Sequence, residues 1–170
     1  MWSPEQYHRY NSERSRPFFD LLSQVHLSRV QTIADLGCGT GELTAALAQQ
    51  WPDARIWGVD SSAEMITEAK TRAVPDRMSF ELGDLREWKS PVPLDLLISN
   101  ATLQWVPDHH VVLPRLIEMI SSGGALAFQV PGNADAPSPA GNNFQISFNP
   151  FGRDPCLLKT SAARSKPGGY

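Results

Sequence analysis

The chain has 170 residues, a formal net charge of −3 and a hydrophobic fraction of 41%, values that suit one globular domain. The charge is nearly balanced and no basic run occurs, which disfavours a nucleic-acid partner. The sequence contains no apolar stretch of about 18 residues, so we expect no membrane span. The N-terminus lacks a basic region followed by an apolar one, and two cysteines, Cys38 and Cys156, indicate neither a disulfide frame nor a metal cluster. We therefore expect a cytoplasmic protein.

Apolar periodicity predicts helices and strands in alternation along most of the chain. The first expected element is an amphipathic helix over about 13–26, with Pro17 in its first turn, where a missing N–H is tolerated. This order predicts an α/β fold with an open parallel sheet, right-handed crossovers and helices on both faces. Strands are expected over about 32–36, 55–59, 78–82, 94–99 and 125–130, and further helices over about 41–50, 62–73 and 109–120.

The pattern changes after the fifth expected strand. The remaining chain is rich in Pro, Gly, Ala, Asn and Ser, and residues 144–148 alternate in a way that indicates one short strand. We predict a domain over residues 1–133 and an irregular, flexible tail over residues 134–170.

A glycine-rich loop, Asp35-Leu36-Gly37-Cys38-Gly39-Thr40-Gly41, joins the first expected strand to the next helix. Glycines let the backbone approach a ligand without a Cβ in the way. Their spacing is one residue tighter at the third glycine than the dinucleotide fingerprint. Asp35 would repel a pyrophosphate but would suit an ammonium group, so the loop favours a cationic ligand. The alternative is a strand-helix turn that binds nothing.

Polar residues also end the next three expected strands. Asp60 lies about 20 residues past the loop, where an acid can accept hydrogen bonds from ribose hydroxyls; a helix cap is the alternative. Asp84, followed by Leu85, suits a ring edge that carries donors, although Gly-Asp is also a common turn. Asn100 ends the fourth strand. Because ligands of open α/β sheets bind at the carboxyl ends of the strands, we expect these residues to share a cleft.

These motifs resemble those of the class I S-adenosylmethionine-dependent methyltransferases. The resemblance implies a Rossmann-like fold and S-adenosylmethionine as the cofactor, with the glycine loop at its methionine end, Asp60 on the ribose, Met65 packed on adenine and Asp84 at the adenine amine. Periodicity alone favours helix packing for Met65. The cofactor-binding residues expected are Asp35, Gly37, Gly39, Gly41, Asp60, Met65, Asp84, Leu85 and Asn100.

The stretches 2–7, 14–22, 99–105 and 129–133 allow a narrower comparison. Together they resemble the trans-aconitate methyltransferases within this family, and the resemblance covers residues 1–138. The resemblance implies methyl transfer to a carboxylate of a small polycarboxylic acid, giving a methyl ester. A carboxylate is already ionised at neutral pH, so we expect positioning to drive the reaction and name no general base.

Candidates for the acceptor side follow from the same resemblance. Tyr7 and Tyr10 resemble a segment that closes over the cofactor, and aromatic faces suit a sulfonium cation. Gln104 and Trp105 follow the fourth strand and would border the acceptor; plain packing is the alternative for the aromatic residues. Three arginines could bind a polycarboxylate or form a solvated helix face, and the sequence leaves both open: Arg9, Arg14 and Arg16. For three histidines, surface or capping positions are favoured over a role as a base: His8, His109 and His110.

After about Ser138 the chain departs from the family, whose members continue with an antiparallel hairpin and further helices. We therefore expect missing C-terminal strands, an exposed edge on the fifth strand and an incomplete acceptor half. Two alternatives stay open: a truncated cofactor-binding fragment without turnover, and a carboxyl methyltransferase acting on an acid bound to an acyl-carrier protein. A dehydrogenase is disfavoured by Asp35.

Overall fold

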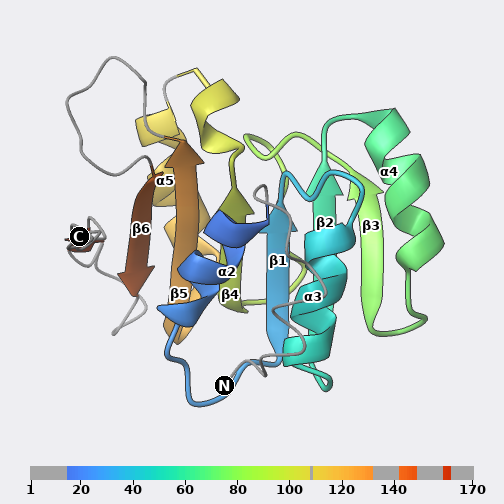
Figure 1. Ribbon diagram of the computed structural model, residues 1–170, viewed down its shortest axis with the longest axis horizontal. Helices are drawn as coiled ribbons and strands as arrows, with labels where there is room; N and C mark the ends of the chain where they lie inside the picture. The colour runs from blue at the N-terminus through green and yellow to red at the C-terminus, as the bar shows by residue number, and fades with distance from the viewer. Residues whose placement is uncertain (1–14, 108, 132–141, 149–158, 162–170) are drawn as a thin grey trace, which may run out of the picture.

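The computed structural model describes residues 15–107, 109–131, 142–148 and 159–161. These residues form one sheet with the strand order β3-β2-β1-β4-β5-β6-β7 (Figure 1). Strands β1 to β5 are parallel, whereas β6 and β7 are antiparallel to their neighbours. The strands are β1 (Thr32–Leu36), β2 (Arg55–Asp60), β3 (Met78–Leu82), β4 (Leu94–Asn100), β5 (Ile120–Pro131), β6 (Asn142–Phe148) and β7 (Lys159–Ser161).

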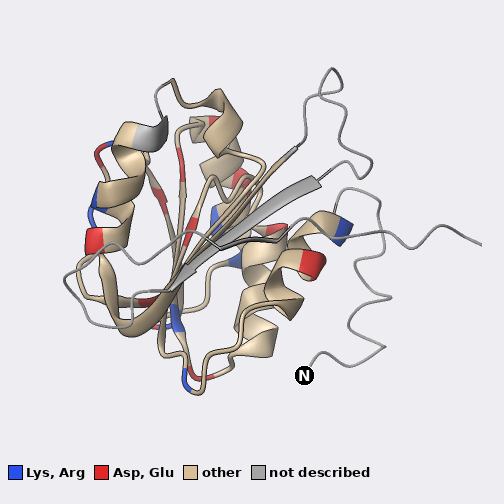
Figure 2. Ribbon diagram, turned by 90° about the vertical axis from the view of Figure 1, so that its left-hand side faces the viewer, with Lys and Arg blue, Asp and Glu red and all other residues tan. Residues whose placement is uncertain are grey.

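Helices cover both faces of the sheet, which Figure 2 shows nearly edge-on between them. In Figure 1, α2 and α3 lie in front of the strands and α5 lies behind them, so the predicted open parallel sheet with helices on both faces is confirmed. Among the described helices, none is both long and apolar enough to span a membrane. The helices are α2 (Arg16–Ser23), α3 (Glu42–Gln50), α4 (Ala63–Ala69) and α5 (His109–Glu118), with 3-10 turns η1 (Lys70–Arg72) and η2 (Leu103–Trp105).

Two hydrophobic cores lie on the two faces of the sheet because successive side chains of a strand point to opposite faces. In β1, Ile33 packs into the core that contains α2 and α3, whereas Leu36 packs into the core that contains η2 and α5. Asp35 lies two residues after Ile33 and therefore shares the α3 face. This placement decides the environment of its carboxylate.

The boundary between α5 and β5 differs from the prediction. The helix ends at Glu118 and the strand begins at Ile120, five residues before the expected start at 125. The Leu94 amide donates to the Met119 carbonyl at 2.9 Å, and Ile120 pairs with Leu94 before the register shifts. Ile120 is therefore buried in the sheet rather than in the apolar stripe of the helix.

The strand predicted over 144–148 is confirmed, since it lies inside β6, whereas β7 was not predicted. The expected exposed edge on the fifth strand is wrong, because β6 pairs with β5 from Ala125 to Pro131. The sheet thus has two strands beyond the fifth. Residues 132–141, 149–158 and 162–170 lie outside the described residues, and the division of the chain at residue 133 stays a prediction.

Candidate functional site

A cleft of about 660 Å³ lies where the carboxyl ends of four strands meet. The loop after β1 contributes Gly37 and Gly39, the end of β2 contributes Asp60, the loop after β3 contributes Asp84, and the end of β4 contributes Asn100. The chain enters β1 at the centre of the sheet, where the strand order reverses between β1 and β4. This is the position at which open α/β sheets bind ligands, and the expected shared cleft is present.

The carboxylate of Asp60 links two loops at this cleft. Its Oδ2 accepts a hydrogen bond from the Gly39 amide at 2.9 Å, and its Oδ1 accepts one from the Ser62 amide at 2.9 Å. Ser62 caps α4, since its Oγ accepts from the Met65 amide at 3.3 Å. Each carboxylate oxygen can accept a second hydrogen bond. Asp60 therefore holds the loop and still offers acceptor positions to a ligand.

Asp35 is placed differently from Asp60. Its side chain is buried, with 3% of the residue exposed, and Asp35 is not among the residues that line the cleft. The Thr44 hydroxyl of α3 donates to its Oδ2 at 2.6 Å. Burial raises the pKa of Asp35 to about 6; the Thr44 hydrogen bond opposes this shift and the charge of Asp60 adds to it. Asp35 thus lies behind the glycine loop, and its contact with a ligand stays a prediction.

The three glycines of the loop have different surroundings. A Cβ on Gly37 would lie 2.0 Å from Oγ1 of Thr102, and one on Gly41 would lie 2.7 Å from the Phe80 ring. A Cβ on Gly39 would meet nothing within 4 Å. The absent side chains at Gly37 and Gly41 therefore serve the packing of the loop. Of the two loop glycines that line the cleft, Gly37 and Gly39, only Gly39 has open space where a Cβ would stand.

Cys38 lies inside the same loop as a free, buried thiol. Burial raises its pKa, and the charges of Asp35 and Asp60 raise it further. Nucleophilic cysteines need the opposite, a lowered pKa in an electropositive setting. Cys38 is therefore a small packing residue of the loop and not a nucleophile.

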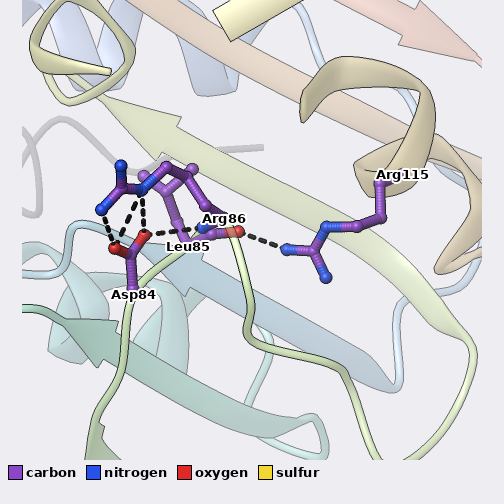
Figure 3. A network of polar contacts seen from close by, with 4 residues as sticks. All are labelled: Asp84, Leu85, Arg86 and Arg115. Atoms are coloured by element: carbon purple, nitrogen blue, oxygen red, sulfur yellow. Dashed lines mark hydrogen bonds and ion pairs between the residues drawn. The ribbon is translucent and has the colours of Figure 1, made fainter. Parts of the chain in front are cut away.

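Asp84 is bound by a residue that the sequence analysis did not single out, Arg86 (Figure 3). The Arg86 amide donates to Oδ1 of Asp84 at 2.8 Å, Nε donates to Oδ1 at 3.0 Å and to Oδ2 at 2.9 Å, and Nη2 donates to Oδ2. The Arg86 contacts hold the pKa of Asp84 below its usual value. The spacing Asp-x-Arg was visible in the sequence, but without the turn it does not predict this pairing.

Arg115 fixes the loop after β3 from the opposite side. From α5, its Nη1 donates to the Trp88 carbonyl at 2.8 Å and its Nη2 to the Leu85 carbonyl at 2.5 Å. Leu85 is buried and, like Asp84, lines the cleft. The loop that carries two predicted cofactor residues is therefore anchored to the helix behind it.

Three further predicted residues line the cleft with distinct properties. Met65 is 40% exposed and Trp105 is 80% exposed, so neither side chain is buried in the core, and both line the cleft. The Oδ1 atom of Asn100 is buried and has no hydrogen-bond partner among the described residues. A buried acceptor without a donor is costly, so this atom favours a ligand that carries an N–H or O–H group.

Two further candidates for the acceptor side, Gln104 and Arg16, are not among the residues that line the cleft. Gln104 does not line it, and its Nε2 donates to the Ala101 carbonyl at 2.7 Å. Arg16 lies on α2 with its side chain 72% exposed, 3.9 Å from Asp20, which fits the solvated-face alternative. Several candidate residues, or their side chains, lie outside the described part of the chain: Tyr7, Tyr10, Arg9, Arg14, His8, His109 and His110.

The charges of the cleft limit what it can bind. Its described lining includes two carboxylates, Asp60 and Asp84, and a single cation, Arg86, which is paired with Asp84. Acceptors therefore outnumber free cationic donors, which disfavours a pyrophosphate and favours a ligand rich in N–H and O–H groups. Within the described residues, no group of three or more His, Cys, Asp or Glu side chains could hold a metal ion.

Comparisons with known proteins show which proteins this chain is similar to. Residues 33–124 match a family described as a methyltransferase domain. Proteins named trans-aconitate 2-methyltransferase are 49% identical over 132 residues in Escherichia coli O1:K1 / APEC and 50% identical over 143 residues in Streptomyces avermitilis. These matches cover 78% and 81% of this chain, and 52% and 53% of the relatives. The chain therefore spans about half the length of the curated relatives that it matches.

A solved structure gives an independent likeness of the fold. An S-adenosylmethionine-dependent methyltransferase from Mesorhizobium loti superposes with a TM-score of 0.60 at 24% sequence identity. The superposition covers 67% of this chain and 53% of that one. At this identity the likeness concerns the sheet and its helices.

Proposed function

This chain belongs to the methyltransferase domain family, and we propose that it binds S-adenosylmethionine in the cleft and transfers the methyl group to a carboxylate of trans-aconitate, giving a methyl ester. Relatives named trans-aconitate 2-methyltransferase, about half of whose length this chain spans, support the choice of acceptor. The acceptor partner is thus a small carboxylic acid. A cytoplasmic location stays a prediction.

One observation carries the cofactor proposal: the Asp60 carboxylate faces the cleft while it accepts from Gly39 and Ser62. Two oxygens with spare acceptor positions match the two adjacent hydroxyls of a ribose. The unpaired Oδ1 of Asn100 offers a further acceptor, and Gly39 leaves room where a side chain would otherwise stand. The residues present therefore fit the cofactor.

The proposed roles follow the order of the strands. The glycine loop with Asp35 holds the methionine end, Asp60 the ribose, and Asp84 with Leu85 the adenine edge, while Met65 covers the adenine face. Asn100 accepts a hydrogen bond deep in the cleft. On the acceptor side we propose Tyr7, Tyr10, Gln104 and Trp105.

When bound, S-adenosylmethionine supplies a methyl group on a positively charged sulfur. The chain needs no residue to deprotonate the acceptor, because a carboxylate is ionised at neutral pH. The task of the site residues is to orient the two reactants in line and to exclude water around the carboxylate. Consistent with this task, we assign no acid-base residue.

Calorimetric titration tests the cofactor. S-adenosylhomocysteine is expected to bind, and NADH is not. Asp60→Ala is expected to weaken the binding of S-adenosylhomocysteine at least tenfold, since a charged hydrogen-bond partner contributes about 1.5–3 kcal/mol. Binding of NADH with no response to S-adenosylhomocysteine would contradict the proposal.

Transfer of a labelled methyl group tests the acceptor. Free trans-aconitate is expected to become labelled at a carboxylate, and the label is expected to be lost on alkaline hydrolysis of the ester. Labelling of an acid bound to an acyl-carrier protein, with free trans-aconitate unlabelled, would replace the proposed acceptor by the rival one.

A further inference from the structure

The hydrogen bonds around Asp84 have a consequence for the cofactor, given the proposed function on which this inference rests. We propose that Arg86 competes with the adenine amine for the Asp84 carboxylate, so that the cofactor binds by displacing the guanidinium. Arg86 is then a residue that lowers cofactor affinity, and its removal tightens binding.

The argument starts from the acceptor capacity of Asp84. A carboxylate has about four lone-pair positions, two on each oxygen. The amide and Nε of Arg86 both donate to Oδ1, at 2.8 and 3.0 Å, while Nε and Nη2 donate to Oδ2. Because the single Nε hydrogen is shared between the two oxygens, these contacts come from three N–H groups and leave at most one lone-pair position open. An adenine amine that approaches the carboxylate therefore competes with the guanidinium for it.

The second step is that Asp84 cannot easily turn away from Arg86. The Arg86 amide holds the carboxylate within the turn, and Arg115 fixes the carbonyls of Leu85 and Trp88 from behind. The Arg86 side chain, in contrast, is 56% exposed and lines the cleft. The guanidinium is therefore the part that moves when a ligand takes its place.

The third step concerns magnitude. Ion pairs exposed to this degree contribute little, because water competes for both partners and salt screens them. An incoming amine can therefore replace the guanidinium, but part of its binding free energy is used in doing so. We expect Arg86→Met to lower the dissociation constant of S-adenosylhomocysteine by about two- to fivefold, the range of an exposed pair.

Titration of S-adenosylhomocysteine into the purified chain and its variants tests this inference. This ligand has no net charge at neutral pH, so removing a positive charge from the chain does not by itself change its overall attraction to the chain. Arg72→Met is the matched control: it removes the same charge from a pair with Glu68, 3.4 Å away on the surface and outside the cleft. This control is expected to bind like the wild type. Arg86→Lys, which keeps the charge without the two-point contact, is expected to lie between wild type and Arg86→Met.

Measuring Arg86→Met in a chain that also lacks the Asp84 carboxylate separates competition for that carboxylate from other effects of Arg86 on binding. When Asp84 is first replaced by Ala, which leaves no side-chain acceptor for Arg86 or for the adenine amine, the further change Arg86→Met is expected to leave the dissociation constant unchanged. Equal or weaker binding by Arg86→Met in the wild-type background, with its melting temperature retained, overturns the inference and makes Arg86 a support for Asp84. A wild-type chain that binds no S-adenosylhomocysteine would overturn the proposed function, and this inference with it.

Discussion

The Gly39 amide donates a 2.9 Å hydrogen bond to Oδ2 of Asp60, so the acid at the end of β2 holds the loop that follows β1. The two residues are 21 positions apart and come from neighbouring strands. The same carboxylate is proposed to bind the ribose. Loop geometry and ligand recognition are therefore coupled at one side chain.

This coupling predicts that Asp60→Ala and Asp60→Asn differ. Asn keeps one acceptor for Gly39 or for a ribose hydroxyl, whereas Ala removes both and frees the loop. We expect the affinity for S-adenosylhomocysteine to fall about tenfold in Asp60→Asn and about a hundredfold in Asp60→Ala, as for loss of hydrogen bonds to a charged group. Calorimetry measures both; equal affinity of the two variants would contradict the double role.

A second prediction concerns Asp35 and pH. Its pKa is raised to about 6 by burial, so the folded protein holds a proton that the unfolded chain releases at lower pH. Stability therefore falls as pH rises from about 4 to 6, because the folded state binds more protons in this window. Asp35→Asn removes this dependence and is expected to stabilise the chain at neutral pH by about 1–3 kcal/mol.

Urea unfolding of wild type and Asp35→Asn at several pH values measures this effect. Asp20→Asn, a change at an exposed carboxylate of α2, serves as the control and is expected to leave the pH profile unchanged. The same Asp35→Asn variant is expected to bind the cofactor more weakly, so a gain in stability accompanies a loss in affinity. A wild-type profile that rises with pH over the window would contradict the assignment.

The third prediction separates steric crowding from backbone strain in the glycine loop. Gly37 and Gly123 have nearly the same φ, +80° and +81°, but a Cβ on Gly37 would lie 2.0 Å from Oγ1 of Thr102, whereas one on Gly123 meets nothing within 4 Å. We expect Gly37→Ala to destabilise the chain by about 3 kcal/mol and Gly123→Ala by about 1–2 kcal/mol.

Thermal unfolding checks the difference between the two alanine variants. Combining Gly37→Ala with Thr102→Gly removes the clashing side chain and is expected to recover the steric part of the loss. A double variant no more stable than Gly37→Ala alone would show that the strain lies in the backbone and not in the contact with Thr102.

The fourth prediction compares two tryptophans near the cleft. Trp105 is 80% exposed, whereas Trp88 is 9% exposed and its Nε1 donates to Oε1 of Glu81 at 3.0 Å. Trp105→Ala is expected to change stability by less than about 0.5 kcal/mol, and Trp88→Ala to cost about 3–5 kcal/mol. A labelled-methyl assay is expected to show a raised KM for trans-aconitate in Trp105→Ala; an unchanged KM would remove Trp105 from the acceptor side.

Local chemistry predicted the strand ends of this fold well. Gly-Asp, Val-Asp and Asp-x-Gly sequences mark where β3, β2 and β1 end, and side-chain alternation in buried strands leaves little freedom in register. The carboxyl ends of parallel strands share one edge, so Asp60, Asp84 and Asn100 had to lie near one another. Their shared cleft followed from topology alone.

Contacts between distant segments could not be predicted in this way. The burial of Asp35 depends on Thr44 of α3, and the crowding of Gly37 depends on Thr102, 65 positions later in the chain. The end of α5 was missed because Met119 and Ile120 are apolar in both a helical stripe and a buried strand, and only pairing with Leu94 decides between them. Sequence periodicity carries no information on such partners.

The reactivity of the buried Cys38 thiol can be used to measure how often the glycine loop opens. Only 8% of the residue is exposed, and its thiolate must reach solvent to attack a disulfide reagent, so labelling requires local opening of the loop. In a Cys156→Ser chain, the labelling rate thus counts opening events under native conditions. A ligand resting against Gly39 would slow that rate in proportion to its occupancy, without any need for turnover.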